Sequence, residues 1–284
     1  MITVLEALNL STEYLNKKGI ESARLNAELM LAHILNCKRL QLYLMFDRPL
    51  DENELSLYRE FLARRAKREP LQYILGEVEF YNIKLKVNQD VLIPRPETEL
   101  LVEKIVKDYS HKNDFKFLDI GIGSGNISIA LLVNLPNSQG VGIDISDSAL
   151  ALAKSNAEFN LVKDRLELIH FDILKDDIQL LGKFDAVISN PPYVSSEDFE
   201  TLEPELKVYE PHIALTDFYN GLTFYRKIIS IADSLLKEEG KVYFEIGKGQ
   251  SNEVKALMED SRIKNLNIIK DYQGIERIIC GELK

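Results

Sequence analysis

Cysteines and long apolar runs are both scarce in this sequence. Cys37 and Cys280 are its only cysteines among 284 residues, and they form no CxxC spacing. Two distant thiols are typical of a reducing compartment and argue against a cysteine-based site, so we expect no metal. No apolar run approaches the ~20 residues that span a bilayer, and the charged N-terminus lacks the apolar core of a signal peptide. We therefore expect a cytoplasmic protein with no membrane partner.

An excess of basic residues is also lacking. Lys and Arg number 35 against 45 Asp and Glu, which gives a formal net charge of −10. Because contacts to phosphates need Lys and Arg, this composition disfavours nonspecific duplex binding, and we expect no direct nucleic-acid partner. A local basic cluster, RRAKR at Arg64 to Arg68, is interpreted as a solvated helix end.

The first part of the chain has the residue spacing of helices. The stretches ARLNAELMLAHIL (Ala23 to Leu35) and ENELSLYREFLARRAKRE (Glu52 to Glu69) repeat apolar residues at helical intervals. The stretch EFYNIKLKV that follows alternates in polarity, which indicates a hairpin. We predict a helical domain at residues 1–72, a β-hairpin linker at 73–97 and a larger domain at 98–284.

The linker ends in a stretch that is rich in proline. Pro94 and Pro96 hold the backbone extended around Arg95. Thr98 is a candidate N-cap for a helix that begins at Glu99.

From Phe115 onward, strand-like and helix-like segments alternate. This pattern predicts an α/β fold, in which a mostly parallel sheet is covered by helices on both faces. Late in the chain, YNGLTFYRKIISIADSLLKEEG predicts one long helix closed by Gly240. The C-terminal segment predicts two strands around a Gln-Gly turn.

A glycine-rich loop, LDIGIGSGN, joins the first of these strands to its helix. Gly121, Gly123 and Gly125 allow a sharp turn and close approach of a ligand, and the helix N-terminus behind them presents free N–H groups. Asp144 ends the next strand, where a carboxylate can accept both hydroxyls of a ribose. A tight structural turn remains the alternative on this motif alone. The spacing is not the G-x-G-x-x-G of a dinucleotide site, because Asn126 stands where the third glycine would be.

The stretch ISNPPYV, Ile188 to Val194, interrupts a smooth apolar run with an amide and two prolines. Ligands of open α/β sheets bind outside the carboxyl ends of the strands, so Asn190 should face the same crevice as the glycine loop. Pro191 and Pro192 would fix where the Asn190 amide points. A turn without further function is the alternative reading.

Together these motifs resemble the class I S-adenosylmethionine-dependent methyltransferases, with their Rossmann-like fold. The G-x-G-x-G spacing after Asp119 is similar to motif I, and NPPY is similar to the motif of enzymes that methylate planar nitrogens. The resemblance implies that Asn190 Oδ1 and a carbonyl of the proline segment accept N–H groups of the substrate, while Tyr193 packs on its plane. S-adenosylmethionine would be the cofactor and S-adenosylhomocysteine the product.

A closer resemblance, to the HemK/PrmC family of glutamine methyltransferases, covers nearly the whole chain. It implies transfer of a methyl group to the side-chain amide of the glutamine in the Gly-Gly-Gln loop of class-I peptide chain release factors. One departure is Asn26, where the family pattern has an aspartate. The matching segments are EPLQYILG from Glu69, LIPRPETE from Leu92, SNPPYV from Ser189, YEPHIAL from Tyr209, NGLTFYRKI from Asn220, FEIGKGQ from Phe244 and KDYQGIER from Lys270.

The resemblance also implies roles for individual residues. Arg95 and Glu97 would shape the wall of the substrate pocket or form an ion-pair hinge, and both readings stay open. The helical domain would dock the release factor, and we expect a monomer. A ribosomal-protein glutamine or an exocyclic base amine is the alternative substrate. The implied cofactor-binding residues are Asp119, Gly121, Ile122, Gly123, Ser124, Gly125, Asp144, Asp172, Ile173 and Asn190, and the implied catalytic and substrate-binding residues are Asn190, Pro191, Pro192 and Tyr193.

Overall fold

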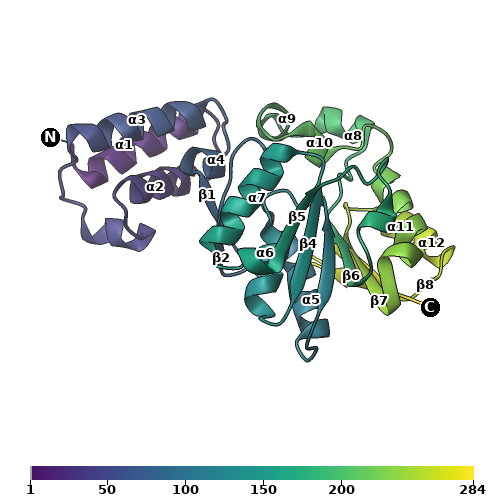
Figure 1. The fold of residues 1–284 in the computed structure, drawn as a ribbon. Helices are drawn as coiled ribbons and strands as arrows, with labels where there is room; N and C mark the ends of the chain where they lie inside the picture. Colours follow the sequence, from purple (N-terminus) through teal and green to yellow (C-terminus); the bar gives the residue numbers. More distant parts are fainter. Residues whose placement is uncertain (1) are drawn as a thin grey trace. The chain divides into compact units, whose positions relative to one another are not determined.

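The computed structural model describes residues 2–284 and divides them into two compact units. The helical unit contains the residues up to Glu77 together with the later segment Glu203–Tyr209. The sheet unit contains Val78–Leu202 and Glu210–Lys284 (Figure 1). Within residues 2–284, no helix combines the length and apolarity that a membrane span requires.

The helical unit packs around a core of its own. Leu8, Met30 and Tyr58 are fully buried or nearly so. The predicted helices are confirmed, and the second starts with a capping box in which Asp51 and Glu54 bond each other's backbone N–H groups. The elements are α1 (Val4–Lys17), α2 (Ala23–Ile34), η1 (Arg39–Leu44), α3 (Glu52–Ala66), α4 (Leu71–Leu75) and α9 (Pro204–Tyr209).

The basic cluster at the end of α3 is not the solvated helix end that its sequence predicts. Arg65 is only 7% exposed. Its Nε donates to Asn26 Oδ1 at 2.8 Å, and its Nη1 lies 3.2 Å from Glu205 Oε1. The prediction was wrong because the partner carboxylate comes from α9, which lies far away in the sequence.

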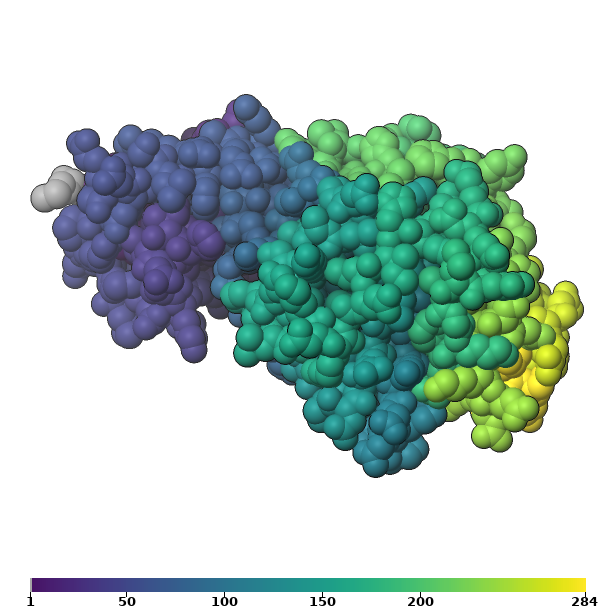
Figure 2. Space-filling model, viewed as in Figure 1, coloured from purple at the N-terminus to yellow at the C-terminus, as the bar shows by residue number. Residues whose placement is uncertain are grey.

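The sheet unit contains a seven-stranded sheet with the order β5-β4-β3-β6-β7-β9-β8. Strands β3 to β7 are parallel, and β9 runs antiparallel to both β7 and β8. The strands are β3 (Lys116–Ile120), β4 (Gln139–Asp144), β5 (Leu166–His170), β6 (Phe184–Ser189), β7 (Leu236–Glu245), β8 (Ile263–Lys270) and β9 (Glu276–Leu283). The predicted hairpin is confirmed as β1 (Glu77–Phe80) and β2 (Ile83–Lys86). In Figure 2 the yellow C-terminal residues lie at the outer margin of this unit.

Helices cover both faces of the sheet, as the alternating pattern predicts. One face packs against α5 (Glu99–Tyr109), α6 (Asn126–Asn134) and α7 (Asp147–Phe159). The other packs against α11 (Thr223–Leu235) and α12 (Ser251–Glu259) (Figure 1). Every residue of β6 is buried, as expected for a central strand with two covered faces.

Two local predictions need correction. The long helix does not reach Gly240, because α11 ends at Leu235 and the chain enters β7 at Leu236. The residues that follow, Lys237 to Glu239, are charged and good helix formers, so the sequence carries no signal that the helix ends at Leu235. Thr98 precedes α5 but makes no capping bond with its side chain, because its own backbone is already helical, with φ −66° and ψ −21°. Its hydroxyl donates to Glu245.

Between β6 and α11 the chain forms three short helices that the sequence did not predict. They are α8 (Ser196–Thr201), α9 and α10 (His212–Leu215). None is long enough to show a helical repeat of apolar residues, which is the signal that sequence analysis depends on.

Candidate active site

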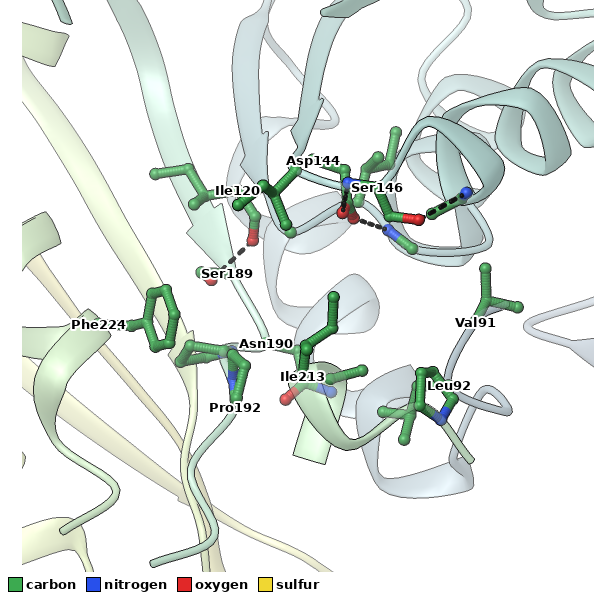
Figure 3. A pocket seen from close by; sticks show the side chains of 18 of the residues that line it. Val91, Leu92, Ile120, Asp144, Ser146, Ser189, Asn190, Pro192, Ile213 and Phe224 are labelled. Atoms are coloured by element: carbon green, nitrogen blue, oxygen red, sulfur yellow. Dashed lines mark hydrogen bonds between the residues drawn. The ribbon is translucent and has the colours of Figure 1, made fainter. Parts of the chain in front are cut away.

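A cavity of about 370 Å³ lies at the carboxyl ends of the parallel strands (Figure 3). Its floor comes from the loops after β3, β4, β5 and β6, and residues 90–98 and 211–224 complete its walls. The sheet order reverses at β3, since β4 and β5 lie on one side of it and β6 and β7 on the other. Such a switch point is where open α/β sheets bind ligands.

The glycine loop after β3 adopts a backbone that requires glycine. Gly121, Gly123 and Gly125 have φ angles of +76°, +53° and +83°. A Cβ at Gly121 would meet no atom within 4 Å, and one at Gly123 only a single backbone oxygen at 4.0 Å. A Cβ at Gly125 would lie 2.9 Å from Ile129 Cδ1, so this glycine serves helix packing. The first two glycines leave open space along the cavity wall.

Asp144, at the end of β4, has half of its acceptor sites engaged by backbone. Gly123 N donates to its Oδ2 at 2.9 Å, and Ser146 N donates to its Oδ1 at 3.0 Å (Figure 3). A carboxylate has about four acceptor sites, so one remains free on each oxygen. Burial raises the pKa of Asp144 above its ordinary value, although these backbone bonds oppose the shift. The carboxylate is thus prepared to accept two hydroxyl groups at adjacent positions.

The loop after β5 brings apolar and acidic groups to the same wall. Phe171, Asp172 and Ile173 all line the cavity. Asp172 also organises its own loop, because its Oδ1 accepts from Leu174 N at 2.9 Å and its Oδ2 pairs with Lys175 at 2.9 Å. Phe171 and Ile173 are nearly buried and form a surface suited to a flat ring.

Asn190 follows β6 directly and faces the cavity with Pro192 (Figure 3). Pro191 also lines the cavity. Ser189, the last residue of the strand, donates its hydroxyl to Ile120 O at 2.8 Å and ties β6 to β3. The fully buried strand therefore fixes the position of the Asn190 amide at the edge of the cavity.

Behind Asn190 lies a small buried polar group. Asn190 Nδ2 lies 3.4 Å from Thr98 Oγ1, and Thr98 Oγ1 donates to Glu245 Oε2 at 2.6 Å. Tyr193 OH lies 3.4 Å from the other oxygen of Glu245. Thr98 is 1% exposed and Glu245 2%. Burial raises the pKa of Glu245 from about 4.5 to about 7.

Arg95 lines the cavity and is held by an ion pair. Its Nη2 donates to Glu210 Oε1 at 2.6 Å, and Glu210 also accepts from Ile93 N at 3.3 Å. Glu97, its predicted companion, does not line the cavity. Arg95 therefore lines the cavity, and its ion pair with Glu210 lies within the sheet unit.

Not all of the predicted site residues meet in this cavity. Asp119 lies beneath the loop, where Ser128 Oγ donates to its Oδ2 at 2.7 Å, and its Oδ1 has no partner among residues 2–284. Gly125 and Tyr193 also lie outside the lining. The predicted residues that line the cavity are Arg95, Gly121, Ile122, Gly123, Ser124, Asp144, Asp172, Ile173, Asn190, Pro191 and Pro192.

Several lining residues received no role from the sequence. Leu92, Ile213 and Phe224 face the cavity from three separate segments (Figure 3). Each lies in a segment that carries the family resemblance, namely LIPRPETE, YEPHIAL and NGLTFYRKI. An unexplained apolar residue in such a segment was the signal that could have identified them.

Comparisons with known proteins agree with this geometry. Residues 6–76 match the family described as PrmC N-terminal domain, and residues 96–204 match the methyltransferase small domain. The chain is 41% identical to a release factor glutamine methyltransferase of Fusobacterium nucleatum, over 98% of this chain and 78% of that protein. It is 40% identical to one of Geobacter sulfurreducens, over 99% of this chain and 97% of that protein. A solved methyltransferase of Pyrococcus furiosus shares the fold, with a TM-score of 0.53 at 16% identity over 82% of this chain and 98% of that one. The fold is that of the class I S-adenosylmethionine-dependent methyltransferases.

Proposed function

We propose that the protein methylates the glutamine of the Gly-Gly-Gln loop in class-I release factors. The chain belongs to the family of release factor glutamine methyltransferases. The methyl group moves to the side-chain amide nitrogen, and that nitrogen loses a proton. One observation carries the proposal beyond family membership. The Asn190 amide and the Asp144 carboxylate line a single cavity, as a substrate amide and a nucleoside cofactor require.

The cavity fits S-adenosylmethionine, which supplies an electrophilic methyl group. Gly121 and Gly123 leave open space where an amino-acid moiety can lie against the backbone. Asp144 has two free acceptor sites for the ribose hydroxyls, and Phe171 with Ile173 offers an apolar surface for the adenine. A cavity of about 370 Å³ is within the range of small-molecule sites.

Asn190 is the proposed acceptor for the substrate amide. An amide nitrogen is a weak nucleophile because its lone pair is delocalised into the carbonyl group. A fixed acceptor at Asn190 Oδ1 orients the nitrogen and stabilises the positive charge that grows on it. The rigid Pro191-Pro192 segment limits movement of this acceptor. A strong base is unnecessary, because the N–H becomes acidic once the methyl group has transferred.

We propose that the helical unit recognises the release factor outside its Gly-Gly-Gln loop. All residues that line the cavity belong to the sheet unit, so the helical unit is not needed for cofactor chemistry. It also exposes large apolar side chains on η1, where Leu40 is 70% and Leu44 87% exposed. We place the protein in the cytoplasm, since its proposed substrate acts in translation, and we keep the expectation of a monomer.

The proposal is tested by mass spectrometry of a release factor incubated with the protein and S-adenosylmethionine. We expect one added methyl group on the glutamine of the Gly-Gly-Gln peptide, and none when that glutamine is replaced by alanine. Methylation of a ribosomal-protein glutamine or of a nucleic-acid base, with an unmodified release factor, would favour the alternative substrates.

A further inference from the structure

The carboxylate of Glu245 is unusual because it is buried and no cationic side chain in the described part of the chain forms an ion pair with it. Among residues 2–284, the hydrogen-bond partners of its side-chain oxygens are the hydroxyls of Thr98 and Tyr193. A buried carboxylate with so few partners destabilises the fold, and the rise of its pKa to about 7 reflects this cost. Glu245 lies at the carboxyl end of β7, next to β6, and so comes close to Asn190.

When Glu245 is ionised, the hydrogen bonds of this group have one consistent direction, because the carboxylate can only accept. A threonine hydroxyl has a single proton, and the 2.6 Å contact places that proton on the line to Glu245 Oε2. Thr98 Oγ1 therefore presents lone pairs to Asn190, which suit the amide nitrogen and repel the amide oxygen. At 3.4 Å the contact from Asn190 Nδ2 is long, so its main effect is to favour one amide orientation over the other.

The orientation matters because the two ends of an amide have opposite hydrogen-bonding character. With Nδ2 turned to Thr98, Asn190 Oδ1 is left as the group that can accept N–H from a substrate. After a rotation of the amide by half a turn, Nδ2 would face the substrate and could only donate, as the substrate N–H groups also do. Asn190 in that state could not accept the N–H groups of the nitrogen to be methylated.

We propose that Thr98 and Glu245 are positioning residues that hold the Asn190 amide with its oxygen toward the substrate. This orientation matters for catalysis only if the proposed function is correct, so the proposal rests on that function. The orientation of the amide can nevertheless be measured without any methyl transfer.

The kinetic test is a double-substitution cycle in single-turnover methyl transfer to a release factor. Thr98→Val removes the hydroxyl at nearly constant shape, and we expect a rate roughly tenfold to a hundredfold lower, as for other small errors of alignment. Thr98→Ser keeps the hydroxyl and should stay within about twofold of the wild type on the same physical grounds. In an Asn190→Ala background, Thr98→Val should cause no further loss. Equal losses in both backgrounds would overturn the proposal, because Thr98 would then act independently of Asn190.

A second measurement does not depend on activity. The side-chain amide signals of Asn190 in nuclear magnetic resonance spectra are identified by their absence from Asn190→Ala. They should shift in Thr98→Val and stay in place in Thr98→Ser, while affinity for S-adenosylhomocysteine stays unchanged in both. If Thr98→Val does not fold, Thr98→Ala replaces it in both measurements. If the chemical shifts of the Asn190 amide did not change when the Thr98 hydroxyl is removed, the positioning role would be refuted. An inactive wild type whose Asn190 signal responds as expected would instead refute the proposed substrate.

Discussion

Replacement of Asp144 by alanine should weaken cofactor binding by an amount that follows from its bonds. Each carboxylate oxygen already accepts one backbone N–H, from Gly123 or from Ser146, which leaves one acceptor site on each for a ribose hydroxyl. A hydrogen bond to a charged group contributes about 1.5–3 kcal/mol. One such bond corresponds to roughly tenfold to a hundredfold in Kd. We expect Asp144→Ala to lose at least this much.

Isothermal calorimetry with S-adenosylhomocysteine measures this loss directly. Asp147→Ala is the matched control, because that carboxylate lies close in sequence but is 85% exposed and outside the cavity. The control should bind within about twofold of the wild type, since an exposed charge at this distance contributes little. A folded Asp144→Ala protein with unchanged affinity would contradict the ribose assignment.

The same carboxylate predicts a dependence of cofactor affinity on pH. Burial raises the pKa of Asp144, so its protonated form appears at higher pH than for an ordinary aspartate. Protonation removes an acceptor, and affinity should therefore weaken on acidification. Asp144→Asn, which cannot ionise, should bind more weakly at neutral pH and should lack this dependence.

Three further predictions concern other parts of the molecule. Asn190→Ala should slow single-turnover methyl transfer by a factor on the order of 10²–10³. Asn190→Asp should keep part of the rate because an acceptor remains. If Asn190→Ala transferred the methyl group at nearly the wild-type rate, Asn190 would be only a turn residue. Joint replacement of Leu40 and Leu44 by serine should raise KM for the intact release factor without changing cofactor affinity. The control Leu180→Ser, at an 80% exposed position of the sheet unit, should change neither quantity. An unchanged KM in the double variant would reject docking through Leu40 and Leu44. Burial raises the pKa of Asp119 to about 7, so the folded state retains a proton that the unfolded state loses above about pH 4, and stability should fall as pH rises between these values. Between pH 5 and pH 8 about two pKa units of this difference are sampled, so Asp119→Asn should reduce the fall by roughly 3 kcal/mol, at about 1.4 kcal/mol per pKa unit, in chemical denaturation at these two pH values. Equal pH dependence in the two proteins would contradict this origin.

The sequence by itself determined the parts of this protein that depend on local pattern. Strand and helix alternation indicated the parallel sheet, and the glycine spacing indicated the loop after β3. The positions of Asp144 and Asn190 at strand ends placed both in one crevice, because parallel strands bring their carboxyl ends to the same edge of a sheet. These inferences succeed because each rests on residues that are neighbours along the chain or on a rule of topology.

Only the tertiary structure decided the contacts between distant segments. Thr98 had the local pattern of a helix cap, yet its backbone is helical and its hydroxyl donates a hydrogen bond to Glu245 of β7. Arg65 had the pattern of a solvated helix end, yet Glu205 of α9 pairs with it in the helical unit. The physical reason is the same in both cases. A side chain near a helix end has several partners of similar local energy, and the partner that excludes water best is supplied by packing, which no short stretch of sequence specifies.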